Sequence, residues 1–228
     1  MLKKILRICG LCILWFVIIS FVTTLLFRFV PIPFTPLMMV RLIEQKSDGQ
    51  DFKLDKKWES LDHISPNLTL AVVTSEDQKF EDHFGFDIAA IEKATKYNEK
   101  HKGKKVKGAS TISQQTAKNV FLWPSRSWIR KGFEVYFTFV IEICWSKERI
   151  MEVYLNVIEM GPGIYGAEAA SNYYFKKPAI NLTRDESAAI AAILPNPIKW
   201  SASHPTAYIS RKKAWILRHM NEIDLKDF

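Results

Sequence analysis

Cysteine is scarce in this 228-residue sequence: three residues cannot build a disulfide framework, and no Cys/His cluster has the spacing of a zinc site. A glycine-rich phosphate loop, an internal repeat and an alternating apolar–polar run of useful strand length are also absent. Hydrophobic residues make up 48% of the chain, too many for a disordered protein, and no residue type dominates as in a collagen. We therefore expect a mainly α globular protein that needs no organic cofactor.

The excess of basic residues is modest once its distribution is considered. Lys and Arg number 32 against 24 Asp and Glu, which gives a formal net charge of +8. Four basic residues and no acidic residue lie within positions 1–28, beside an apolar segment, so half of the excess belongs to that end of the chain. The other half is ordinary for a soluble domain, and we expect no nucleic-acid partner.

One uncharged run of 20 residues, from Ile8 to Phe27, is long enough to cross a bilayer. As a helix it would extend about 30 Å, the thickness of the hydrocarbon core. It is apolar on every side, and it is longer than a signal peptide's apolar region and lacks the small residues of a cleavage site. Because three basic residues precede it, the positive-inside rule predicts a cytoplasmic tail at 1–7, an anchor at 8–28 and the remaining chain across the membrane.

Three prolines within positions 31–36 end the membrane helix. We assign residues 29–57 to a proline hinge and membrane-proximal linker, and residues 58–228 to a single domain that is large enough for one core. Within the linker, the apolar segment 37–43 would either lie on the outer membrane face or pack against the domain. Residues 44–57 are polar, which is typical of a linker or surface loop.

Apolar residues recur at helical spacing through most of the domain, and Asn67 is expected to cap the first helix. No strand is predicted, so the domain is expected to be all-α. The expected helices cover residues 68–80, 86–100, 110–120, 126–158, 186–193 and 205–220.

The first group of candidate site residues is the segment EDQKFEDHFG at 76–85. Glu76 follows an apolar helical run, so its carboxylate is expected to project from a buried helix end. Partial burial makes a carboxylate a better general base near neutral pH. An ordinary acidic surface segment would give the same pattern.

A second group lies in GASTISQQTAKN at 108–119. Ser110 and Thr111 are good helix N-cap residues, and the start of a helix favours an anion. The hydroxyl groups and paired glutamines of this segment also suit sugar hydroxyls, and Lys118 adds a cation. The alternative is a well-capped helix with a polar face.

Charged residues spaced four apart form the third group. On a helix, Arg126, Arg130 and Glu134 would share a face, with Lys131 beside them. On an exposed helix they would form a salt-bridge ladder. In a cleft they would instead bind a diphosphate, and the carboxylate could hold a divalent cation beside the phosphates.

A fourth segment, KERIMEVYLN, aligns Glu152 with Asn156 on one helix face. Taken in order, the four segments resemble the glycosyltransferase family 51 domain, the peptidoglycan glycosyltransferases. The family's signatures read E-D-x-x-F-x-x-H-x-G, G-x-S-T-I-x-Q-Q-x-x-K-N, R-K-x-x-E and K-x-x-I-x-x-x-Y-L-N. Each signature occurs here, at residues 76–85, 108–119, 130–134 and 147–156.

The resemblance implies a lysozyme-like all-α domain with a jaw embedded in the bilayer, for which residues 37–43 are our candidate. It also implies an enzyme that polymerises lipid II, a disaccharide-pentapeptide on a polyprenyl diphosphate, onto a growing glycan strand. Glu76 would be the general base on the 4-hydroxyl of the acceptor sugar. That oxygen would attack the donor's anomeric carbon with inversion and form a β-1,4 linkage.

The remaining candidate residues receive their roles from the same resemblance. Four cations would stabilise the departing diphosphate, and Glu134 would assist them, with or without Mg²⁺ or Mn²⁺. Four polar residues would shape the sugar sites or brace the cations. The cations are Lys118, Arg126, Arg130 and Lys131, and the polar residues are Ser110, Gln114, Glu152 and Asn156.

The implied location is the bacterial inner membrane, with the domain in the periplasm. The implied partners are membrane lipid and other cell-wall synthesis and division proteins. No exported Ser-x-x-Lys is accompanied by SDN or KTG, so we expect no transpeptidase activity. The competing hypothesis is a lysozyme-like lytic transglycosylase, which needs an acid at the sugar bond but no cations for a diphosphate, so the basic residues at 126–131 argue against it.

Overall fold

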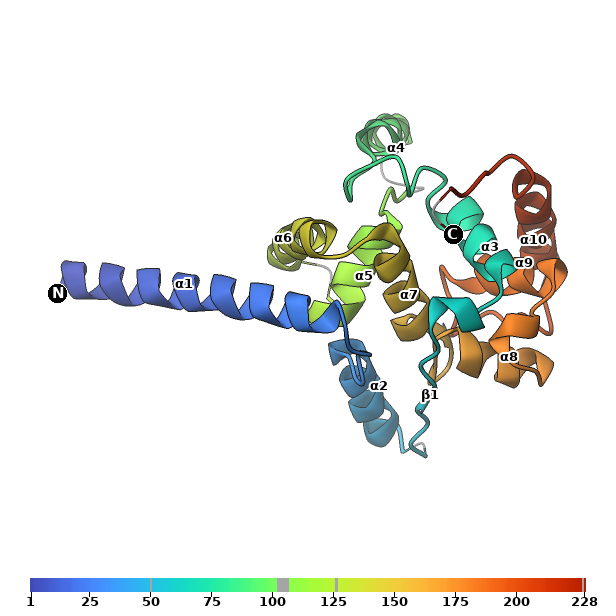
Figure 1. Cartoon of the computed structure of the whole chain (residues 1–228), viewed down its shortest axis with the longest axis horizontal. Coiled ribbons are helices and arrows are strands. Elements are labelled where there is room, and N and C mark those ends of the chain that lie inside the picture. Colours follow the sequence, from blue (N-terminus) through green and yellow to red (C-terminus); the bar gives the residue numbers. More distant parts are fainter. Residues whose placement is uncertain (50, 102–106, 126, 227) are drawn as a thin grey trace.

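The computed structural model describes residues 1–228 except 50, 102–106, 126 and 227. Its first helix, α1 (Leu2–Phe27), projects as a long rod from a body formed by the other elements (Figure 1). Among the described residues, α1 is the one helix long and apolar enough to cross a membrane. This finding supports the predicted anchor.

The regular secondary structure in the described part of the body is almost entirely helical, which confirms the mainly α prediction. Two 3₁₀ turns and three very short strands accompany the helices. The helices are α2 (Pro36–Ser47), α3 (Pro66–Glu76), α4 (Ile88–Lys100), α5 (Ile112–Phe121), α6 (Trp128–Cys144), α7 (Lys147–Val157), α8 (Ala167–Phe175), α9 (Arg184–Ile193) and α10 (Ala207–His219), and the turns are η1 (Leu61–His63) and η2 (Ala179–Asn181).

The first helix of the domain begins and ends earlier than predicted. Pro66 occupies the first turn of α3, a position that proline favours because its missing amide hydrogen is not needed there. The N-cap is Ser65, so the expected cap, Asn67, was wrong. The helix ends at Glu76 because Asp77 adopts an extended backbone with φ −163°.

The predicted helix over 126–158 is two helices in the structure. Trp145 adopts an extended conformation, with φ −117° and ψ 148°, and ends α6. Ser146 then starts α7, because its Oγ accepts the backbone N–H of Arg149 at 3.2 Å. The apolar periodicity continues across this break. Only the N-cap residue, Ser146, indicates that a second helix begins there.

A small sheet that was not predicted pairs the end of the predicted linker with two strands of the domain. Strands β1 (Asp55–Lys56), β2 (Glu159–Gly161) and β3 (Ile164–Tyr165) lie in the order β1-β3-β2, with β1 parallel and β2 antiparallel to β3. Such short strands cannot show the alternation that predicts a strand. The polar linker is also shorter than predicted, because α2 continues to Ser47.

The turn between β2 and β3 requires glycine at position 163. Gly163 has φ +68°, and a Cβ there would lie 2.4 Å from the backbone oxygen of Lys53. We expect Gly163→Ala to destabilise the fold by about 2–4 kcal/mol, since both strain and a backbone clash are introduced. Thermal unfolding in detergent should give a lower Tm. Gly132→Ala, which meets nothing within 4 Å in a helix, is the matched control and should not lower Tm; equal Tm values for both variants would contradict the prediction.

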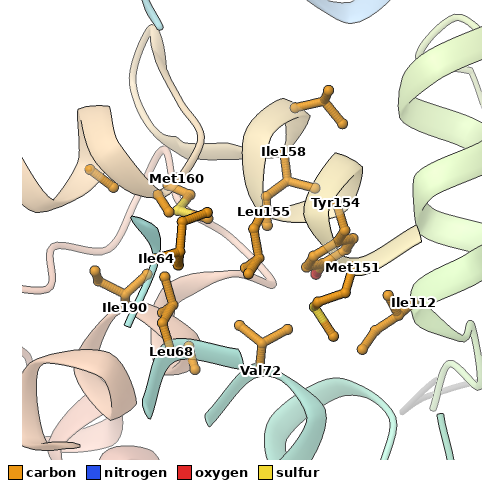
Figure 2. Close-up of a cluster of buried hydrophobic side chains, with 14 of the residues drawn as sticks. Ile64, Leu68, Val72, Ile112, Met151, Tyr154, Leu155, Ile158, Met160 and Ile190 are labelled. Carbon is orange, nitrogen blue, oxygen red and sulfur yellow. The ribbon is translucent and has the colours of Figure 1, made fainter. Parts of the chain in front are cut away.

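The hydrophobic core gathers apolar side chains of α3, α5, α7 and α9, with α5 packed against α7 and α9 packed against α3. Figure 2 shows Met151, Tyr154 and Leu155 of α7 pointing toward Leu68 and Val72 of α3. These side chains are at most 1% exposed. The core therefore fixes the C-terminal end of α3 and the exposed face of α5, the two places from which the candidate site is built.

Helix α1 contacts the body through hydrogen bonds at several points. Ser20 Oγ lies 2.6 Å from the hydroxyl of Tyr136 on α6, and Trp145 donates its indole N–H to the backbone oxygen of Thr24 at 2.8 Å. Arg149 donates to the oxygen of Phe27 at 2.7 Å, which satisfies a carbonyl at the end of α1. The anchor thus has a defined place against α6 and α7.

Candidate active site

Two adjoining pockets are lined by four of the ten candidate residues: Glu76, Ser110, Lys118 and Arg130. The first, which we call the Glu76 pocket, has a volume of about 760 Å³. The second, the Lys118 pocket, has a volume of about 620 Å³ and is also lined by Arg130. Gln115 and Pro195 line both pockets, so the two spaces are neighbours with a common wall.

Glu76 is the last residue of α3, and its side chain is 13% exposed at the pocket wall. Its Oε2 accepts a hydrogen bond from Gln115 Nε2 at 3.0 Å. Its Oε1 accepts from Ser75 Oγ at 3.3 Å and lies 3.9 Å from Lys212 Nζ. Tyr154 holds the glutamine in turn, because its hydroxyl donates to Gln115 Oε1 at 3.3 Å. The carboxylate is therefore held in one orientation with access to the pocket.

The residue after Glu76 joins α3 to the start of α5. Asp77 is buried, and its carboxylate accepts the backbone N–H of Ile112 and the ring N–H of His83, each at 3.0 Å. Lys147 donates to the backbone oxygen of His83 at 2.6 Å. Aspartate, histidine and lysine of the sequence signatures thus brace the helix end that carries Glu76.

Lys118 is a half-buried ammonium group on α5. Within the part of the chain that the structure describes, its side chain makes no hydrogen bond or ion pair, although Arg130 lines the same pocket. Burial lowers the pKa of Lys118, an effect that outweighs the opposite one of Glu134 and Glu76. An anion in the pocket would supply the missing partner.

Glu134 on α6 forms ion pairs with two cations, Arg130 and Lys131, which lie one helical turn before it. The residue is only 3% exposed, and its carboxylate accepts from Arg130 Nη1 at 2.6 Å and also from Lys131 Nζ. Arg130 is further held by the backbone oxygen of Ser125, which accepts from its Nε at 2.6 Å. The fourth predicted cation, Arg126, lies outside the described residues.

A protein-held divalent cation does not fit the described residues. Both oxygens of Glu134 already accept from Arg130 and Lys131, so a metal ion here would have to share this carboxylate with two adjacent cations. No group of three His, Cys, Asp or Glu suited to a metal occurs in the described part of the chain. The predicted Mg²⁺ or Mn²⁺ stays a prediction.

The four predicted polar residues separate into different places. Ser110 is exposed and lines the Glu76 pocket. Gln114 is buried, and its carboxamide oxygen accepts the backbone N–H of Thr111 at 3.1 Å, so it caps α5.

The two predicted residues of α7 lie away from both pockets. Glu152 pairs with Arg149 and lines a separate hollow, and its Oε2 also accepts the backbone N–H of Leu61 at 3.3 Å. Asn156 is fully buried and exchanges hydrogen bonds of 2.9 and 2.8 Å with the backbone of Glu59. In this geometry both side chains hold the segment before α3.

Sequence reasoning missed two residues beside Glu76. Gln115 stands next to Gln114 in the paired glutamines, but only the helix phase shows which of the two faces Glu76. Lys212 comes from α10, and nothing in its local sequence places it in the pocket. Burial lowers its pKa, against the raising effect of Glu76.

Comparison with known proteins agrees with this geometry. Residues 44–221 match the family model described as transglycosylase. A protein of Bacteroides thetaiotaomicron is 53% identical over 220 residues, 96% of this chain and 88% of the relative. One of Mannheimia succiniciproducens is 52% identical over 218 residues, 95% and 88% of the two chains, and one of Pseudomonas putida is 49% identical over 223 residues, 98% and 94%. All three are named biosynthetic peptidoglycan transglycosylase. The chain therefore belongs to the transglycosylase family.

Proposed function

We propose that this protein is a peptidoglycan glycosyltransferase, which polymerises lipid II into β-1,4-linked glycan strands and releases polyprenyl diphosphate. The family and the names of its relatives support this reaction. In the chain itself, the observation that carries the proposal is Lys118, a half-buried cation without a partner among the described residues, in the pocket next to Glu76. A polymerase that expels a diphosphate needs such an anion site, whereas a lytic enzyme does not.

In the proposed reaction, the acceptor sugar occupies the Glu76 pocket. Glu76 takes the proton of the 4-hydroxyl, and the oxygen attacks the anomeric carbon of the donor. The new C–O bond forms as the bond from that carbon to the diphosphate breaks, so the configuration inverts. Gln115 and Ser75 keep the carboxylate oriented toward the acceptor.

Negative charge then develops on the leaving diphosphate in the Lys118 pocket. Lys118 and Arg130 both line that pocket before the reaction, and Glu134 and the backbone oxygen of Ser125 hold Arg130 in place, so positive charge is already present where the negative charge develops. Glu134 acts through its two ion pairs, because it holds Arg130 and Lys131 in place and limits their mutual repulsion. Ser110, at the rim of the Glu76 pocket, is suited to a sugar hydroxyl.

We also propose a single-pass topology in the bacterial inner membrane, with the N-terminus in the cytoplasm and the domain in the periplasm, because α1 is apolar enough to span a bilayer and three basic residues precede its uncharged run. Because α6 packs beside α1, its outward apolar face would enter the outer leaflet. The segment 37–43 is a weaker candidate for this jaw, since Met38 is fully buried. The exposed apolar residues of α6 are Trp128, Ile129, Val135, Phe139 and Ile143. Cell-wall and division proteins stay predicted partners.

The test compares synthesis with cleavage. Purified full-length protein in detergent is incubated with labelled lipid II and, separately, with preformed glycan strands. We expect polymer and free polyprenyl diphosphate from the first reaction and intact strands in the second. Cleaved strands without polymer would instead establish the lytic alternative.

A further inference from the structure

We propose that helix α2, which connects the anchor to the domain, completes the diphosphate site, with Arg41 binding phosphate oxygens and Leu37 contacting the adjacent isoprenoid carbons. This inference rests on the proposed function. It extends the site to residues that precede the family match, which begins at residue 44. None of the four sequence signatures includes Arg41, which lies in the segment predicted to be a linker.

The composition of the Lys118 pocket fits a lipid diphosphate. Its charged lining consists of three cations, Arg41, Lys118 and Arg130, and one carboxylate, Glu159. These cations come from three different helices or their flanks, α2, α5 and α6, so the positive charge converges from separate parts of the fold. Five apolar side chains and three prolines also line the pocket, beside the polar Gln115, Asn119, Ser125 and Tyr154; the apolar ones are Leu37, Leu122, Trp123, Ile158 and Leu194.

Two hydrogen bonds orient the guanidinium group of Arg41 but do not use all of its N–H donors. Its Nε donates to Glu159 Oε2 at 3.2 Å, and its Nη1 donates to Glu44 Oε2 at 2.7 Å. The described residues offer no partner to Nη2, so the planar group keeps donors for a phosphate. The side chain of Glu159 is 8% exposed and holds the guanidinium in place, whereas that of Glu44 is 50% exposed. A surface pair of the latter kind is weak and can yield to a diphosphate.

The backbone that carries Arg41 is well fixed. Thr35 caps α2 by accepting the N–H of Met38, and Pro36 occupies the first turn. Met38 is fully buried, and Lys56 donates to the backbone oxygen of Ile32 at 2.7 Å just before the helix. Since the helix is anchored at its start, Leu37 and Arg41, one turn apart, face the pocket together.

The experiment measures binding of farnesyl diphosphate, a short prenyl diphosphate, to the full-length protein in detergent by calorimetry. We expect Arg41→Ala to weaken binding about tenfold, because a charge-assisted contact is lost, and Arg41→Lys to weaken it less. Lys46→Ala, at an exposed position on the same helix, is the matched control and should stay within about twofold of the parent. In lipid II polymerisation, Arg41→Ala should raise KM more than it lowers kcat.

The outcomes separate this inference from the proposed function. If the parent binds farnesyl diphosphate and polymerises lipid II but Arg41→Ala binds equally well, α2 is not part of the site and the inference fails alone. If the parent neither binds the diphosphate nor makes polymer, the proposed function fails with it. Should Arg41→Ala lower Tm strongly, Arg41→Gln takes its place, because it removes the charge but can still donate to Glu159: a loss of about tenfold would support the inference, and binding within twofold of the parent would overturn it.

Discussion

Glu76→Gln is expected to lower the rate of lipid II polymerisation by about 10²–10⁴-fold, the usual contribution of a general base. Glutamine keeps the size of the side chain and can still hydrogen-bond Gln115, but it cannot accept the proton of the acceptor hydroxyl. The loss should therefore appear in kcat, with little change in the affinity for lipid II. Single-turnover polymerisation of labelled lipid II measures it directly.

The matched control is Glu92→Gln, which changes the same functional group at an exposed position of α4. It should polymerise lipid II at the parent rate, and both variants should unfold at nearly the parent Tm. Because Glu76 accepts hydrogen bonds from Gln115 and Ser75, a drop of Tm in its variant would signal a disturbed helix end rather than a lost base. Parent-like turnover by Glu76→Gln would remove this residue from the chemistry.

Much of the fold could be predicted because its signals are local. An uncharged run long enough for a bilayer predicts α1 from hydropathy alone, and apolar spacing predicts most helices of the domain. The predictions failed where a single side chain, or a contact between residues far apart in the sequence, determines a helix boundary or a strand. Ser146 divides α6 from α7 within a continuous apolar pattern, and Ser65 with Pro66 moves the start of α3 away from Asn67. The small sheet depends on pairing between residues about 110 positions apart, such as Asp55 and Ile164, which no local pattern reports.

The candidate site, too, could be predicted only in part from the sequence. Glu76 and Lys118 could be identified because each lies in an ordered signature, and the fold brings them to adjoining pockets. Helix phase, in contrast, decides that Gln115 faces Glu76 while Gln114 caps its own helix. Lys212 reaches the site only through the packing of α10 against α9 and α3, a tertiary arrangement that the sequence does not encode locally.

Lys118→Met is expected to lower kcat/KM for lipid II by about 10²–10³-fold, comparable with the loss of one oxyanion donor. Methionine fills the half-buried stem position, so the fold should be retained while the charge at the diphosphate is lost. The same variant should bind inorganic pyrophosphate more weakly than the parent. Unchanged kcat/KM would show that Lys118 does not stabilise the leaving group.

Lys118→Arg tests the cause of that effect through its pH dependence. Burial lowers the pKa of Lys118, so in the free enzyme the ammonium loses its proton as the pH rises, earlier than an exposed lysine does. The cation that receives the diphosphate is then lost, and kcat/KM should fall on the alkaline side. Arginine stays protonated through this range, so the alkaline fall should move to higher pH even if the variant is slower at neutral pH. An alkaline limb at the same pH in both proteins would assign that limb to a different group, because the two side chains differ in the pH at which they lose their charge.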